Sequence, residues 1–103
     1  MNMNKLNVKD IVSEIPAAWV SRVLGEVGPA RIKALRMDAL PFGEESHKYN
    51  EALFVLDGKM ELSIEGEPVT VGSGELVMIE ADTVHSVLPE SFGTLMIIDL
   101  SDG

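Results

Sequence analysis

Apolar and polar residues alternate along most of the chain beyond residue 18, with the period of two that is typical of β-strands. The clearest stretch places three apolar side chains on one side of a strand and three polar ones on the other: Met60, Leu62 and Ile64 against Glu61, Ser63 and Glu65. Further short runs, separated by turns that contain glycine or proline, bring the expected number of strands to about eight. The pattern predicts an all-β sandwich or barrel without parallel βαβ units.

Three local features lead to finer predictions. Asp57-Gly58 is a typical hairpin dipeptide, so the strand before it is expected to end there. Around Ala34 the apolar positions shift phase by one residue, which predicts a β-bulge. The run 76–79 is wholly apolar, and we expect this strand to be buried on both faces.

The first 18 residues follow a different pattern, in which Asn7 and Pro16 stand where a short helix would begin and end. Between them the apolar residues recur at helical spacing: Val8, Ile11, Val12 and Ile15. We therefore divide the chain into an N-terminal segment, 1–18, that forms a short helix or is irregular, and a β-domain over 19–103.

The composition narrows the possible partners. With 103 residues the chain has the length of one domain. Its formal charge of -9 at pH 7 disfavours binding to nucleic acid or to an anionic membrane surface. No cysteine is present, which excludes disulfides, thiolate ligands and a thiol nucleophile. The chain shows neither a signal-peptide pattern nor an apolar stretch of membrane-spanning length, so we expect a cytoplasmic protein.

The candidate chemistry lies with the only two histidines, His47 and His85, and with Glu51. Two imidazoles and a carboxylate that meet at one point form a ligand set for Fe(II), and the same set suits Mn, Zn, Ni or Cu. Glu45, two residues before His47, can add a fourth ligand if the backbone is extended there. Strand parity does not decide whether Glu51 points inward, because both faces of its strand are apolar.

Two segments resemble the sequence motifs of the cupins. The first motif reads G-x5-H-x-H-x3-E-x6-G, and the segment 45–58 matches its second histidine, its glutamate and its last glycine: His47, Glu51 and Gly58. The second motif reads G-x5-P-x-G-x2-H-x3-N, and the chain matches its first glycine and its histidine: Gly74 and His85. The likeness spans about residues 19–100 and implies a cupin-type jelly-roll β-barrel, also called a double-stranded β-helix.

Position by position, the resemblance places the family's metal ligands on Glu45, His47, Glu51 and His85. Glu45 stands where the family has a histidine. A second carboxylate makes the ligand set harder, which favours Mn or Fe over Cu. The implied cofactor is a divalent metal ion, with Fe, Mn, Zn and Ni as the candidates. Without a metal, we expect the crowded groups to raise the pKa of a histidine or to leave one glutamate protonated.

Other motif positions also depart from the family pattern. Ala39 and Asp82 replace glycines, Glu80 replaces a proline, and Pro89 replaces an asparagine.

Three functions remain open at this point. The first is a metal-dependent cupin enzyme, of the oxygenase or isomerase type, that acts on a small polar molecule. The second is a non-catalytic module that binds or senses such a molecule, and the third is a barrel whose metal site has degenerated, with Glu45 as the first sign. The resemblance, together with an apolar fraction of 46%, implies a homodimer. The resemblance does not assign catalytic residues, because one fold supports many functions.

Overall fold

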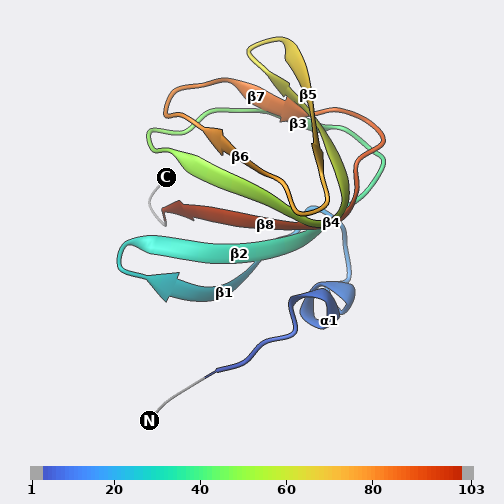
Figure 1. The fold of residues 1–103 in the computed structure, drawn as a ribbon, viewed down its shortest axis with the longest axis vertical. Helices are drawn as coiled ribbons and strands as arrows, with labels where there is room; N and C mark the ends of the chain where they lie inside the picture. Colours follow the sequence, from blue (N-terminus) through green and yellow to red (C-terminus); the bar gives the residue numbers. More distant parts are fainter. Residues whose placement is uncertain (1–3, 101–103) are drawn as a thin grey trace.

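Eight antiparallel strands curl into a barrel-like sheet in the computed structural model, which describes residues 4–100 (Figure 1). The strands are β1 (Arg22–Val27), β2 (Ala30–Met37), β3 (Phe42–Glu45), β4 (Glu51–Ile64), β5 (Glu67–Gly72), β6 (Leu76–Ile79), β7 (His85–Val87) and β8 (Phe92–Leu100). Their order along the sheet is β1-β2-β8-β4-β7-β3, and both β5 and β6 pair with β4. The all-β prediction is confirmed for this part of the chain.

The long strand β4 connects the two halves of the sheet. Its first part pairs with β6 and β8, and its last part pairs with β5 and β7. The predicted hairpin at Asp57-Gly58 is therefore wrong, because β4 runs through both residues and only its register with β8 shifts, just before Asp57. Gly58 has a φ of 82°, and a Cβ atom there would overlap the carbonyl oxygen of Phe92. The dipeptide marks a bulge and a close approach of two strands.

Strand β2 is buried on both faces, which explains the phase shift in its sequence. Leu35 and Met37 point into the barrel, whereas Ala34 packs on the opposite face against the N-terminal helix. The bulge predicted around Ala34 is wrong, because β2 pairs with β8 without a shift in register. The irregularity lies instead in the neighbouring strand β1, between Val23 and Gly25.

Strand β6 is buried on one face only, contrary to the prediction. Ile79 belongs to the main core, whereas Leu76 and Met78 are 52% and 54% exposed on the outer face. Among the described strands β6 pairs with β4 alone, so it lies at an edge of the sheet. Four apolar residues in a row are equally compatible with a buried strand and with an edge strand that has one exposed face.

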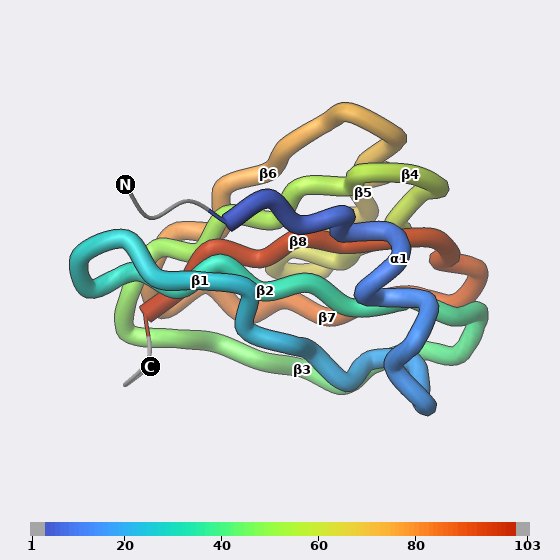
Figure 2. The backbone as a smooth tube through the Cα atoms, turned by 90° about the horizontal axis from the view of Figure 1, so that it is seen from below, coloured from blue at the N-terminus to red at the C-terminus, as the bar shows by residue number. Residues whose placement is uncertain are grey.

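A short helix, α1 (Val8–Ser13), lies in the segment where the sequence predicts one, and it packs against β2 (Figures 1 and 2). Asn7 caps it by accepting a hydrogen bond of 3.1 Å from a backbone amide of the first turn. Arg36 of β2 donates hydrogen bonds to the carbonyl oxygens of Val12, in the helix, and of Ile15, just beyond its end, and so ties this segment to the sheet. No helix in the described range 4–100 is long and apolar enough to span a bilayer.

The main core fills the interior of the curled sheet. Its buried residues come from β2, β4, β5, β6 and β8: Leu35, Met37, Leu53, Val55, Met60, Leu62, Val71, Ile79 and Leu95. Further along the same strands some inward-facing positions carry ionisable groups, among them Glu51 and Asp99. A cavity opens there.

Candidate metal site

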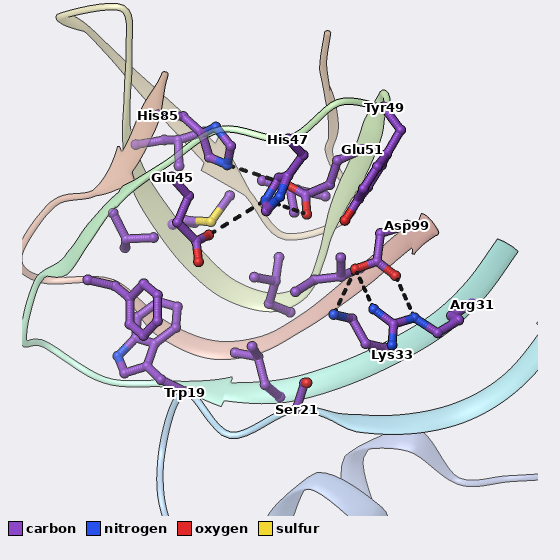
Figure 3. A pocket seen from close by; sticks show the side chains of 18 residues that line it. Trp19, Ser21, Arg31, Lys33, Glu45, His47, Tyr49, Glu51, His85 and Asp99 are labelled. Atoms are coloured by element: carbon purple, nitrogen blue, oxygen red, sulfur yellow. Dashed lines mark hydrogen bonds and ion pairs between the residues drawn. The ribbon is translucent and has the colours of Figure 1, made fainter. Parts of the chain in front are cut away.

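The cavity has a volume of about 370 Å³ and lies inside the barrel (Figure 3). Much of its wall is apolar, with Leu35, Leu53, Met60, Leu62, Leu95 and Ile97 among the lining residues. The four residues predicted as a site, Glu45, His47, Glu51 and His85, all line this cavity. Four polar side chains thus lie beside apolar walls, an arrangement typical of small-molecule sites.

Three strands and one loop supply the four side chains. Glu45 ends β3, which confirms the extended backbone that its role requires, and it lies opposite His85 in the β3–β7 register. Glu51 begins β4 and is buried on the same face as Leu53, so it points inward. His47 lies in the loop between β3 and β4.

Glu51 contacts both imidazoles. Its Oε1 lies 3.3 Å from Nε2 of His85, and its Oε2 lies 3.7 Å from Nε2 of His47. Oε2 of Glu45 approaches the same nitrogen of His47 at 3.9 Å. Glu45, His47 and His85 each offer a ligand atom within 4.8 Å of the other two. Glu51 lies outside this group of three and is linked to it by the separate contacts of its two oxygens with the two imidazoles.

The four side chains differ in how deeply they are buried. The side chains of Glu51 and His85 are only 7% and 5% exposed, whereas that of Glu45 is 46% exposed. Glu45 is therefore the member most accessible to solvent.

Hydrogen bonds tie the loop of His47 to the turn before β7. The amide of Asp82 donates to the carbonyl oxygen of His47 at 2.6 Å, and the side chain of Asn50 accepts from the amide of Ala81 at 2.9 Å. Lys48 and Asp82 add an exposed ion pair of 2.9 Å. These contacts hold the two segments that carry histidines in a fixed relation.

Asp82 keeps the turn that the motif glycine normally supplies. Its φ is 62°, in the left-handed region that favours glycine and that aspartate tolerates better than most other residues. This departure from the motif therefore leaves the position of the loop intact.

In its neutral form, His85 presents an unprotonated nitrogen to Glu51. Its Nδ1 lies 3.0 Å from the carbonyl oxygen of Thr83, which can only accept, so in the neutral ring Nδ1 carries the proton. Nε2 then directs a lone pair at the Glu51 carboxylate, which is also an acceptor when ionised. Nε2 of His47 is buried and has no hydrogen-bond partner among the described residues. Two acceptors that face one another, as Nε2 of neutral His85 and the ionised Glu51 carboxylate do, call for a proton or a cation between them.

Burial raises the pKa of Glu51 above its ordinary value of 4.5, and the two nearby histidines oppose this shift only in part. One glutamate of the group thus shifts toward its protonated form, as expected for crowded groups without a metal. A divalent cation at this point would favour the ionised carboxylate, so metal binding and loss of the proton are coupled.

The spacing fits a metal ion. Ligand atoms about 2.1 Å from a common ion and at tetrahedral angles lie roughly 3.4 Å apart. The distances of 3.3, 3.7 and 3.9 Å between the facing atoms lie on both sides of that value, within about 0.5 Å of it. The Thr83 carbonyl orients the ring of His85, as the outer partners of imidazole ligands do in metal sites.

A second charged cluster lines the cavity, and the motifs do not predict it. Asp99 accepts hydrogen bonds of 3.1 and 3.2 Å from Arg31, and it lies 2.7 Å from Nζ of Lys33. Burial raises the pKa of Asp99, but the hydrogen bonds from Lys33 and Arg31 outweigh this and hold that pKa below its ordinary value of 3.8. The signal in the sequence was the alternation of Arg31 and Lys33 in phase with the buried Leu35.

Comparisons with known proteins agree with this fold. The family model of the cupin domain matches residues 37–100. A cupin-2 domain protein from Shewanella frigidimarina has a TM-score of 0.81 at 22% identity, covering 92% of this chain and 93% of its own. A protein from Neisseria meningitidis has a TM-score of 0.81 at 20% identity, covering 95% of this chain and 100% of its own. None of the curated proteins matches the chain.

A protein of unknown function from Rhizobium leguminosarum is also similar, with a TM-score of 0.74 at 24% identity and coverage of 95% of both chains. At identities this low, structural likeness shows the fold alone. That likeness confirms the predicted jelly-roll barrel. The family model covers more than half of the sequence. The chain therefore belongs to the cupin-domain family.

Proposed function

We propose that this cupin binds a divalent metal ion through Glu45, His47, Glu51 and His85, and holds a small polar molecule beside the ion in the cavity. The main support is the buried approach of Nε2 of His85 to Oε1 of Glu51 at 3.3 Å, with Thr83 fixing the proton on the far side of the ring. Nε2 of His47 adds a second buried imidazole nitrogen that lacks a hydrogen-bond partner in the described part of the chain.

The donor set favours particular metals. Two carboxylates and two imidazoles are harder than the usual histidine-rich set, which supports Mn or Fe and leaves Zn and Ni as further candidates. When bound, such an ion acts as a Lewis acid toward an oxygen of the bound molecule. Glu45, the most exposed of the four side chains, either completes the ligand set or holds a proton beside that molecule.

Elemental analysis of the purified protein tests the proposal. We expect about one metal ion per chain at saturation, and loss of that ion in His85→Ala. Val84→Ala is the matched control, because it removes an exposed side chain from the neighbouring position. Substoichiometric metal that His85→Ala leaves unchanged would contradict the proposal and support a degenerate site.

The same geometry supports a non-catalytic binding module, because a metal and a cavity serve recognition as well as turnover. A thermal-shift screen over metals and small metabolites finds ligands for either function. Incubating each hit with the metal-loaded protein then separates the two. An enzyme of the oxygenase or isomerase type converts the hit, whereas a sensor releases it unchanged.

The expected setting is a cytoplasmic homodimer that binds neither nucleic acid nor membranes. The formal charge of -9 supports the exclusion of polyanionic partners. The outer face of the sheet supports the dimer, because Met78 and Ile98 flank Ala52 on paired strands and are 54% and 41% exposed.

A further inference from the structure

Three charged side chains occupy inward-facing strand positions that are apolar elsewhere in the barrel. Arg31 and Lys33 alternate in phase with Leu35 along β2, and Asp99 alternates in phase with Ile97 along β8. Arg31 and Asp99 are direct partners in the β2–β8 register. Figure 3 shows the three charged side chains on the side of the cavity away from His85 and Glu45.

This cluster carries a net positive charge in a partly desolvated position. The side chain of Asp99 is 3% exposed, and those of Lys33 and Arg31 are 16% and 25% exposed. Two cations share a single carboxylate, which leaves a surplus of one positive charge. Apolar packing would serve stability at least as well as such a buried cluster. A negatively charged ligand in the cavity explains the positive charge of the cluster better.

The cluster sets the charge of the whole cavity once a metal is present. A divalent ion together with the carboxylates of Glu45 and Glu51 is neutral. The surplus positive charge of the cluster of Arg31, Lys33 and Asp99 therefore remains. That charge is opposite in sign to the formal charge of -9 on the whole chain. A monoanion balances it, whereas a phosphate monoester, with a charge of about -1.5 to -2 at neutral pH, exceeds it.

We propose that the cavity binds a small organic acid, with its carboxylate at Arg31 and Lys33 and an uncharged oxygen directed toward the metal. This inference rests on the proposed metal site for the second contact and for the choice of a monoanion over a dianion, whereas the contact with Arg31 and Lys33 does not depend on it. A guanidinium has five N–H donors and an ammonium has three, so both side chains keep donors beyond those that Asp99 accepts. The apolar walls, including Leu35 and Ile97, suit the carbon chain of such an acid.

Isothermal titration calorimetry with matched probes tests the inference. The probes are ω-hydroxycarboxylic acids of two to six carbons, each paired with its primary amide, and methyl phosphate serves as the dianion. The Mn(II)-loaded protein should bind at least one acid about tenfold more tightly than its amide, and more tightly than methyl phosphate. Equal affinity for every acid and its amide would overturn the inference, and tighter binding of methyl phosphate would overturn the assignment to a carboxylate.

Variants assign the effect to the cluster. Lys33→Met should abolish the preference for the acid, whereas Arg22→Met, which removes a cation from an exposed position outside the cavity lining, should leave it unchanged. Asp99→Asn removes the competing carboxylate and should increase the affinity for the acid. If Lys33→Met does not fold, Asp99→Asn still decides, because a purely structural cluster predicts weaker binding or no change.

Metal content measured on the same samples separates this inference from the proposed function. Bound manganese without a preference for acids rejects the inference and leaves the metal site standing. A preference for acids that persists without bound metal and disappears in Lys33→Met rejects the metal site and keeps the anion contact. Loss of both rejects both.

Discussion

Nε2 of His85 and Oε1 of Glu51 face each other at 3.3 Å inside the barrel, and both side chains are almost completely buried. Neither atom carries a hydrogen when His85 is neutral and Glu51 is ionised, because Thr83 fixes the imidazole proton on Nδ1. The contact is therefore unfavourable in the metal-free protein at the protonation states that a metal ion requires. Stability and metal binding make opposite demands on this pair.

Glu51→Gln should stabilise the metal-free protein while abolishing metal binding. The pKa of Glu51 is raised on folding by burial, so the folded state loses stability as the pH rises from 4.5 through the folded-state pKa, and glutamine removes that loss. At neutral pH we expect a Tm about 5 °C above that of the parent, which corresponds to roughly 1 kcal/mol for a domain of this size.

Thermal melts of the metal-free parent and of Glu51→Gln between pH 4 and pH 8 check this expectation. The advantage of the variant should vanish near pH 4, where the parent carboxyl is protonated in both states. A variant that is less stable than the parent at every pH would show that Glu51 acts mainly through favourable contacts.

Glu45 should tune which metal is bound. Glu45→His restores the residue type of the cupin motif and makes the donor set softer, so the affinity for Ni(II) and Zn(II) should rise relative to that for Mn(II). Glu45→Gln should weaken Mn(II) binding by about tenfold, through loss of one charged ligand. Competition titrations with a chelating dye measure both effects.

Glu44→Gln is the control for Glu45, because it neutralises the exposed carboxylate immediately before it in β3. Equal effects of Glu44→Gln and Glu45→Gln on Mn(II) affinity would show that Glu45 acts only through the general negative charge of this edge.

Asp82 should tolerate glycine but not a β-branched residue. Its φ of 62° suits glycine, and Asp82→Gly loses only the exposed ion pair with Lys48, which contributes at most about 1 kcal/mol. Asp82→Val strains the turn by about 1–2 kcal/mol and should displace the loop of His47, which its amide holds. Chemical unfolding and Mn(II) titration should both rank the parent and Asp82→Gly above Asp82→Val.

The outer face of β6 should form the dimer interface. Met78→Lys places a charge in the exposed apolar row and is expected to shift the protein from dimer to monomer at micromolar concentration. Leu40→Lys, at an even more exposed position in a loop, should leave the dimer intact. Light scattering coupled to size exclusion gives both masses, and a monomeric parent would refute the dimer.

Most of the candidate site follows from the sequence, because ligand residues are recognised by type and spacing. His47, Glu51 and Gly58 lie at the intervals of the cupin motif. Only the inward direction of the Glu51 side chain could not be predicted from the sequence. The cation cluster was harder to predict. Arg31 and Lys33 point inward, but the buried Ala34 on the other face of β2 disturbs the alternation that would have shown this.

The wrong predictions about the fold have a common physical origin. Asp57-Gly58 satisfies the local requirement of a hairpin, a positive φ at glycine, but here glycine is needed because Phe92 of the paired strand β8 leaves no room for a Cβ atom. The burial of β6 likewise depended on a partner element, which its sequence does not specify. In each case a long-range contact decided between two structures that the local sequence permits equally.

The central claim is that both imidazoles and the Glu51 carboxylate share one metal ion. A crystal structure of the protein grown with MnCl2, with data collected at the manganese edge, tests it most directly. We expect an anomalous peak within about 2.3 Å of Nε2 of His47, Nε2 of His85 and a carboxylate oxygen of Glu51. Manganese bound elsewhere with no peak among these atoms, or a Glu51 side chain turned to solvent, would contradict the account.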